Sequence, residues 1–152
     1  NVSLRPYQPA DLPHLMETWE SANRLAHPFL DDDFVAQVRR DIPALYLPNS
    51  DTWVAEFDDR VIGFISLLGN EIGALFLQPA YHGKKVGKML MEQAIDLYDS
   101  LEVEVFKKNS LGRGFYSKCG FELLEEKLDR QSGELVLRLS LDAVKNRQAA
   151  KV

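Results

Sequence analysis

The chain has 152 residues, of which 45% are hydrophobic and 27% charged, proportions that fit one globular domain with a substantial core. Its net charge of −5, without a long basic tract, excludes a nucleic-acid footprint, and no apolar run approaches the ~20 residues of a membrane span. Cys119 is the only cysteine, which excludes an internal disulfide and a cysteine-based zinc site; NVSLRPYQ has no signal-peptide pattern, and we expect a cytoplasmic protein.

The N-terminal part of the chain is predicted to hold one strand and two helices. Residues 2–5 fit a short strand, and the apolar positions of DLPHLMETWESANRL have the spacing of one helix face, with Asp11 as N-cap. The proline in AHPFL disfavours helical geometry at the residue before it, so the helix should end there. A second helix is expected from about residue 31 to residue 41, before Pro43 and Pro48 interrupt it.

Three strands are predicted next, because the hydrophobic period changes. TWVAEF and VIGFISLL are rich in β-branched and aromatic residues, and Asp58-Asp59-Arg60 between them indicates a hairpin. Gly69-Asn70 indicates a second turn, after which EIGALFLQ reads as a third strand closed by a proline.

The remaining sequence alternates helices with strands. An amphipathic helix is expected over residues 86–97, a strand over LEVEVF, a short helix over residues 111–118, and a hairpin from FELLEEKL and LVLRLSL. These elements predict an α/β (α+β) domain over residues 1–141, with a mixed, mainly antiparallel sheet of six to seven strands flanked by about four helices. Residues 142–152 are expected to form a polar C-terminal tail, frayed or helical.

The stretch HGKKVGKMLM places a basic turn with two glycines directly before an amphipathic helix. The first N–H groups of a helix have no intrahelical partner, and the peptide dipoles add partial positive charge, so an anion binds there favourably. Gly83 and Gly87 would let the backbone approach the anion, while the lysines would attract it. The spacing fits neither G-x-x-x-x-G-K-[ST] nor G-x-G-x-x-G. An ordinary strand-to-helix turn with solvated lysines is the alternative.

A second motif lies in NSLGRGFYSKCGF, which fits N-x-x-[AG]-x-x-[FY]-Y-x-x-x-G-F from Asn109 to Phe121. With this motif the chain resembles the GCN5-related N-acetyltransferase (GNAT) family over residues 2–141, in particular its bacterial branch of small peptidyl-lysine acetyltransferases. The family's pyrophosphate loop, [QR]-x-x-G-x-[GA], aligns with residues 82–87. His82 stands where the family favours Gln or Arg, and Lys85 where it favours Gly. Either Gly83 supplies the flexibility instead, or the Lys85 position needs no positive φ.

The resemblance implies acetyl-CoA as co-substrate and no metal. Its pyrophosphate would lie on the segment His82, Gly83, Lys84, Lys85, Val86, Gly87 and Lys88. Its pantetheine arm would pair, like an added strand, with the strand before this loop, where Leu75 and Leu77 offer backbone groups. One fixed N–H donor there would stabilise the oxyanion of the tetrahedral intermediate, an effect worth roughly 3 kcal/mol in comparable sites.

The resemblance also suggests catalytic residues. Tyr116 stands where the family keeps the general acid that protonates the leaving thiolate, and a phenol has a suitable pKa; a plain core aromatic is the alternative. Glu71 opens the strand that leads into the loop, where some family members place a general base; a solvent-facing carboxylate is the alternative. Asn109 could cap the helix that carries Tyr116, contact the cofactor, or do both. Cys119 has no partner for nucleophilic catalysis, which favours direct transfer.

The acceptor site is least visible in the sequence. In this fold the segment between the first two helices commonly walls the acceptor groove, so His27 and Phe29 are the expected substrate-binding residues. Asp31 and the two aspartates after it could attract a cationic amine, although an N-cap cluster explains them more simply. The three histidines do not have metal-ligand spacing, so no metal is expected.

The sequence therefore predicts an acetyl-CoA-dependent N-acetyltransferase that acts on a primary amine, with a protein lysine as the first choice. Two alternatives stay open: an enzyme for a small amine such as an aminoglycoside or polyamine, and a non-catalytic acyl-CoA-binding sensor. The expected partners are acetyl-CoA and the amine acceptor, with neither nucleic acid nor membrane. A homodimer is compatible with the sequence.

Overall fold

The computed structural model describes residues 1–150 of the chain. The strands are β1 (Ser3–Pro6), β2 (Asp51–Phe57), β3 (Arg60–Leu68), β4 (Glu71–Leu77), β5 (Ser100–Phe106), β6 (Glu122–Asp129) and β7 (Glu134–Asp142). The helices are α1 (Leu12–Ala26), α2 (Asp32–Asp41), α3 (Val86–Leu97), α4 (Ser110–Cys119) and α5 (Ala143–Ala150). Within these residues no helix is both long and apolar enough to cross a bilayer.

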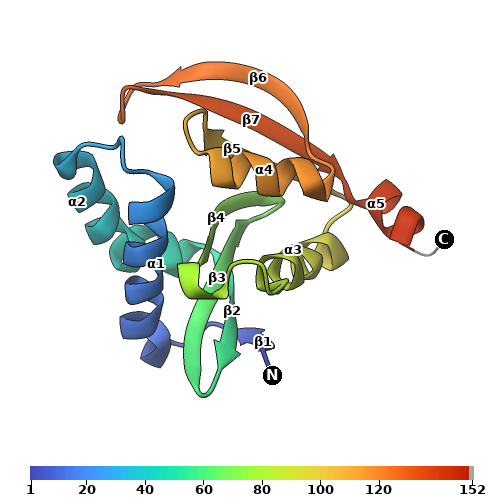
Figure 1. Ribbon diagram of the computed structural model, residues 1–152, viewed down its shortest axis with the longest axis horizontal. Coiled ribbons are helices and arrows are strands. Elements are labelled where there is room, and N and C mark those ends of the chain that lie inside the picture. Colours follow the sequence, from blue (N-terminus) through green and yellow to red (C-terminus); the bar gives the residue numbers. More distant parts are fainter. Residues whose placement is uncertain (151–152) are drawn as a thin grey trace.

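The strands form one mixed sheet with the order β1-β2-β3-β4-β5-β7-β6. All neighbouring strands are antiparallel except β4 and β5, which are parallel because α3 connects them on one side of the sheet. The β6–β7 hairpin arches away from the strands β1 to β4 (Figure 1). The predicted fold class, with six to seven mainly antiparallel strands and helices around them, is confirmed.

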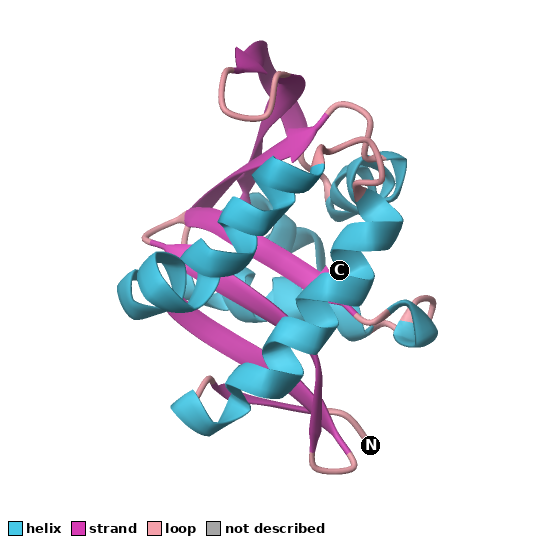
Figure 2. Cartoon of the chain, turned by 90° about the vertical axis from the view of Figure 1, so that its left-hand side faces the viewer, coloured by secondary structure: helices cyan, strands magenta, loops and turns pink. Residues whose placement is uncertain are grey.

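Helices cover both faces of the sheet and divide the core into two clusters. One cluster joins α1 and the turns after α2 to β2 and β3, with Leu15, Trp19 and Phe64 almost fully buried. The other joins α3 and α4 to β3, β4, β5 and β7 around Leu90 and Leu101. Figure 2 looks at the side that carries α1 and α2 and shows helices crossing in front of the strands.

The β2–β3 hairpin shows how the local sequence sets a turn. Asp58 and Asp59 both have positive φ, at 52° and 61°. Two-residue hairpin turns of this kind match the right-handed twist of the strands, and Asp tolerates the left-handed region better than most residues. The predicted hairpin at this position is therefore present, with Arg60 already in β3.

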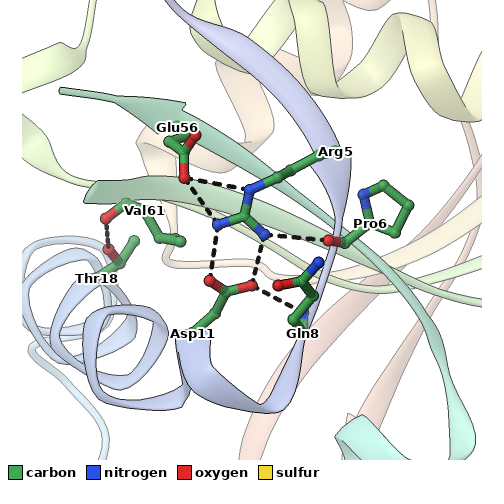
Figure 3. A network of polar contacts seen from close by, with 7 residues as sticks. All are labelled: Arg5, Pro6, Gln8, Asp11, Thr18, Glu56 and Val61. Atoms are coloured by element: carbon green, nitrogen blue, oxygen red, sulfur yellow. Dashed lines mark hydrogen bonds and ion pairs between the residues drawn. The ribbon is translucent and has the colours of Figure 1, made fainter. Parts of the chain in front are cut away.

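One local prediction for the N-terminal half was wrong in detail. Asp11 precedes α1, but its carboxylate does not cap the helix; both oxygens accept hydrogen bonds from Arg5 at 2.8 Å, and Arg5 also binds Glu56 of β2 (Figure 3). The ion pair satisfies the carboxylate better than one backbone N–H would. The predicted end of the second helix is confirmed, since α2 ends at Asp41; Pro43 and Pro48 each lie at the start of a further short helical turn, where the missing N–H is harmless.

The segment after β7 continues as α5 against the domain. Ala143 is fully buried, and Asn146 Nδ2 donates to the carbonyl of Cys119 at 3.0 Å. Arg147 donates to the carbonyls of Ile95 and Tyr98, which close the C-terminal end of α3. A cation that binds the last carbonyls of a helix also complements its dipole.

Candidate active site

The parallel strands β4 and β5 are paired only over their first residues. Their register has two pairs, Glu71 with Glu102 and Ile72 with Val103. At the next position the register between β3 and β4 shifts, which leaves Gly73 without a cross-strand partner. Such a bulge bends the strand and increases its twist. The bend at Gly73 therefore turns the rest of β4 away from β5 and opens a gap in the middle of the sheet.

The backbone of β4 presents hydrogen-bonding groups to this gap. The N–H of Gln78 donates to the carbonyl of Ile62 on β3 at 2.8 Å, and the register then continues without a shift through Leu77 and Leu75. Antiparallel partners alternate between hydrogen-bonded and non-hydrogen-bonded pairs. The N–H and C=O groups of Leu75 and Leu77 therefore point away from β3, toward the β5 side. An unpaired strand edge of this kind can accept an extended chain as an additional strand.

The loop after β4 ends at the N-terminus of α3. Met89 N–H makes the first helical hydrogen bond, to the carbonyl of Lys85, so the N–H groups of Val86, Gly87 and Lys88 precede the intrahelical ladder. Gly83 has φ of 79° and Lys85 has φ of 66°. The loop thus keeps a left-handed residue where the family favours glycine, and the idea that this position needs no positive φ is wrong. His82, Gly83 and the three lysine side chains are exposed.

The two sequence motifs meet at one contact between α3 and α4. A Cβ placed on Gly87 would lie 3.0 Å from Cε1 of Phe115, closer than side chains normally approach. Gly87 is therefore required for helix packing, and its missing side chain would point toward α4 rather than directly into the anion site. The contact holds the amides of α3 beside the helix that carries Tyr116.

Tyr116 lies in the core cluster between α4 and the sheet. Its side chain is 7% exposed, and its ring packs edge-to-face on Phe115 and Phe121 with centroid distances of 5.5 and 5.3 Å. Burial, with a smaller contribution from Cys119, raises the pKa of the phenol above its ordinary value. The phenol therefore stays protonated at neutral pH, as a general acid requires.

Asn109 and His27 join α4 to the end of α1. The side-chain oxygen of Asn109 accepts from the N–H of Gly112 at 2.9 Å, which caps α4 and fixes the orientation of the amide. Asn109 Nδ2 must then donate to His27 Nε2, at 3.1 Å, so Nδ1 of His27 carries the proton and donates to Asn23 Oδ1 at 2.7 Å. Burial lowers the pKa of His27 to about 4, which keeps the ring neutral.

Aromatic rings surround His27 at the C-terminal end of α1. The ring centroids of Phe29, Phe76 and Phe106 lie 5.8, 6.2 and 5.0 Å from that of His27. His27, Phe76 and Phe106 line a cavity of about 240 Å³ between α1, α2 and the sheet, whereas Phe29, which packs on Phe106 at a centroid distance of 5.7 Å, is not among its lining residues. The cavity also touches Gly73, so it reaches the point where β4 and β5 separate.

Glu71 lies at the opposite end of β4 from the α3 loop. Its two carboxylate oxygens accept from Arg138 of β7, at 2.6 and 3.2 Å, and the same guanidinium also binds Glu102 and Glu104 of β5. A bidentate pair of this kind holds a carboxylate firmly in place. Glu71 is thus paired with an arginine and makes none of the hydrogen bonds that join Asn109 and His27.

Several residues of the site were missed by the sequence reasoning. Gly73 sets the gap, and a lone glycine inside a strand pattern is a signal for a bulge that could have found it. Asn23 lies one helical turn before His27, and this i, i+4 spacing could have indicated their contact. Phe106 comes from a segment far from His27 in the sequence, and no local pattern indicates that these two rings meet. Within residues 1–150 no group of three or more His, Cys, Asp or Glu side chains is arranged to hold a metal ion.

Comparison with known proteins identifies the fold. A sequence model of the acetyltransferase (GNAT) domain matches residues 48–123. The peptidyl-lysine N-acetyltransferase YjaB of Salmonella typhimurium is 34% identical over 110 residues, which span 72% of this chain and 75% of that protein. The solution structure of apo-form YjaB from Escherichia coli has a TM-score of 0.83 at 27% identity and covers 92% of this chain and 97% of that chain.

A third relative shows the same fold with a ligand. The crystal structure of the PaiA N-acetyltransferase from Thermoplasma acidophilum in complex with coenzyme A has a TM-score of 0.74 at 21% identity, and covers 91% of this chain and 98% of that chain. The segment matched by the domain model contains the bulge, the α3 loop and the Asn109–Phe121 motif, which are the features that build the gap. The chain belongs to the GNAT family of N-acetyltransferases.

Proposed function

We propose that the enzyme transfers an acetyl group from acetyl-CoA directly to the side-chain amine of a protein lysine. The observation that carries this proposal is the gap in the sheet. An unpaired edge of β4 leads directly to the free N–H groups of α3, and the apolar cavity opens at the same place. An extended thioester and an amine can therefore meet there from two sides.

The hydrogen-bond donors on the cofactor side suit acetyl-CoA. The N–H groups of Val86, Gly87 and Lys88 suit the pyrophosphate, together with the exposed loop from His82 to Lys85. The backbone groups of Leu75 and Leu77 suit the amides of the pantetheine arm. Bound acetyl-CoA supplies the activated acyl group, and one N–H of β4 polarises its carbonyl.

The reaction requires one acid and the loss of two protons from the acceptor. A nitrogen–carbon bond forms and the carbon–sulfur bond breaks. One proton of the ammonium group passes through the base to water, and the loss of a second is balanced by protonation of the leaving thiolate. Tyr116 is proposed as the donor to sulfur, since its raised pKa keeps the phenol protonated. Glu71 is proposed as the base; Arg138 uses two of the roughly four acceptor positions of its carboxylate.

Direct transfer is preferred over a covalent acetyl-cysteine. Burial raises the pKa of the Cys119 thiol to about 11, so very little thiolate forms at neutral pH. The acceptor nitrogen must therefore attack the thioester itself.

The acceptor side is proposed to be bordered by His27, which lines the cavity, and by Phe29, whose ring packs on His27 beside the cavity, with Asn109 contacting the cofactor as well as capping α4. A protein lysine is preferred because the relative from Salmonella typhimurium is a peptidyl-lysine N-acetyltransferase. We also propose that the enzyme works in the cytoplasm, where acetyl-CoA is available. Residues 1–141 are proposed to form the catalytic unit, with residues 142–152 as an appended C-terminal segment. Two copies are proposed to form a homodimer.

The test is turnover with a panel of acceptors. The protein is incubated with acetyl-CoA and lysine peptides, spermidine or an aminoglycoside, while free thiol and the acetylated product are followed together. We expect thiol release that depends on the lysine peptide, with one acetyl group gained per thiol. Tight acetyl-CoA binding without turnover of any acceptor would instead favour an acyl-CoA sensor.

A further inference from the structure

The acceptor cavity has an unusual lining for an enzyme that acts on a cationic amine. Aromatic and aliphatic side chains from α1, α2, β3, β4 and β5 form most of its wall, including Trp19, Phe34, Phe64, Phe76 and Phe106. Among the described residues, no Asp, Glu, Lys or Arg lines it. The wall therefore offers dispersion contacts and almost no charge.

Several polar side chains in the wall are already hydrogen-bonded within the protein. Asn23 accepts from His27, and Ser66 shares a hydrogen bond of 2.8 Å with Thr52. On β4, Glu71 lies two residues before Gly73 and outside the cavity lining, and it shares the guanidinium of Arg138 with Glu102 and Glu104. The described wall of the cavity therefore carries no charged side chain that could act as a counter-charge to a cation.

A cation in such a cavity loses its hydration without gaining an ionic partner. Desolvation of this kind costs several kcal/mol for an isolated ammonium and favours the neutral amine. A polyamine or an aminoglycoside would bring further ammonium groups into or next to the same apolar wall. A single amine on an apolar arm instead buries its carbon atoms and enters in the neutral form that the reaction needs.

We infer that the cavity selects a primary amine carried on an apolar arm and discriminates against polycations. This inference rests on the proposed function, because it assigns the acceptor of the same site. For a peptide substrate, it means a lysine with an apolar neighbour.

The size of the cavity indicates how much of the acceptor it takes. A dry cavity of about 150 Å³ lined by aliphatic and aromatic side chains holds a benzene molecule. The cavity here, at about 240 Å³, is larger. The four methylenes of a lysine fill less than a ring does, so space remains for an apolar side chain next to the lysine. An arylalkylamine such as phenethylamine fits as a single probe.

A charge introduced at the rim provides the test. Leu68 lines the cavity and is 49% exposed, so Leu68→Glu adds a carboxylate at the rim without burying it fully. Leu123→Glu on β6 is the matched control, because Leu123 is 61% exposed and lies outside this cavity. Binding of phenethylamine and of spermidine to each protein is measured by calorimetry in the presence of coenzyme A.

In the unchanged protein, phenethylamine should bind at least about tenfold more tightly than spermidine, because burial of its ring adds a hydrophobic contribution of this order. Leu68→Glu should reduce this ratio to about threefold or less, and Leu123→Glu should leave it unchanged. Spermidine binding as tightly as phenethylamine in the unchanged protein, or the same response in both variants, would overturn the inference.

Turnover of two peptides separates this inference from the proposed function. A lysine flanked by leucines should have kcat/KM about tenfold higher than a lysine flanked by glutamates. Preferential binding of phenethylamine without acetylation of any peptide would reject the proposed function and keep the preference of the cavity. Equal acetylation of both peptides would keep the function and reject the preference.

Discussion

The two sides of the gap in the sheet are built from different parts of the chain. On the proposed cofactor side, the available donors are backbone N–H groups of β4 and of the first turn of α3, and the nearby lysine side chains are exposed. On the acceptor side, the contacts come from side chains of α1, α2, β3, β4 and β5. A backbone site depends on conformation, whereas a side-chain site depends on the identity of each residue.

This difference explains why the family loop tolerates change in this chain. Lys85 replaces a glycine, yet its φ of 66° keeps the geometry that a glycine would adopt. The N–H groups at the start of α3 are unaffected by the exchange. The acceptor wall has no such tolerance, because a single carboxylate would change its chemistry. Substitutions that act on one side and not on the other therefore test the comparison.

The largest expected effect is a loss of kcat when Tyr116, the side chain proposed to protonate the leaving thiolate, is replaced. Tyr116→Phe should lower kcat by about 10²–10³-fold, because it removes the proton donor and keeps the ring packed on Phe115 and Phe121. The KM for acetyl-CoA should hardly change. Steady-state kinetics measure both values, with Tyr98→Phe at the far end of α3 as the control. Normal turnover in Tyr116→Phe would remove Tyr116 from the mechanism.

On the proposed acceptor side, His27 should make the free energy of unfolding depend on pH. Its pKa is about 4 in the folded protein and near 6.5 when unfolded, so the unfolded state binds more protons between these values and stability falls as the pH decreases through this window. From pH 7 to pH 5, His27 should account for a loss of about 2 kcal/mol. Urea unfolding at both pH values measures it.

The control for this titration is a second histidine substitution. His27→Gln should remove the His27 share of the pH dependence, whereas His82→Gln in the exposed loop should keep it. The same pH dependence in His27→Gln and in the unchanged protein would show that another group is responsible.

A smaller effect is expected at the contact between the two motifs. Gly87→Val should destabilise the protein by about 1–2 kcal/mol even without cofactor, because its side chain meets Phe115. Thermal unfolding of Gly87→Val, Phe115→Ala and the double variant measures the coupling. The double variant should lose less stability than the sum of the single variants, and strict additivity would contradict the packing role of Gly87.

The smallest effect tests the backbone character of the cofactor side. Lys85→Gly should raise stability by up to about 1 kcal/mol, since glycine adopts positive φ without strain. The affinity for acetyl-CoA should stay within a few-fold of that of the unchanged protein, because the backbone amides of α3 remain. Lys84→Gly removes a neighbouring lysine of the same loop and should not stabilise the protein. A tenfold loss of affinity in Lys85→Gly alone would mean that the ammonium group carries the binding.

Much of the fold was predictable because local rules agree with the observed structure. The hairpin at Asp58 and Asp59, the capping of α2 by Asp31, and the glycine end of α4 follow from short sequence patterns. Asp11 was predicted to cap a helix and instead binds Arg5, because an ion pair with a distant strand outweighs a local bond. That partner is set by the tertiary fold.

The candidate site also contains features that the sequence could predict and features that it could not. The α3 loop and the motif around Tyr116 were visible because each lies within a short segment. The cavity was not, because Trp19, Phe34 and Phe106 come together only after the sheet and helices have packed. The sequence also could not show that Arg138 takes both oxygens of Glu71, since the two residues are 67 positions apart.

The central claim is that backbone amides of β4 and α3 bind the cofactor while side chains of the cavity bind the acceptor. The most direct measurement is a titration of ¹⁵N,¹³C-labelled protein with coenzyme A and then with phenethylamine, followed by backbone amide and aromatic side-chain NMR shifts. Coenzyme A should shift the amides of Leu75, Leu77 and residues 86–88 most strongly, and phenethylamine should shift the rings of His27 and Phe106. Coenzyme A shifts centred on the cavity, with the amides of residues 86–88 unchanged, would contradict the account.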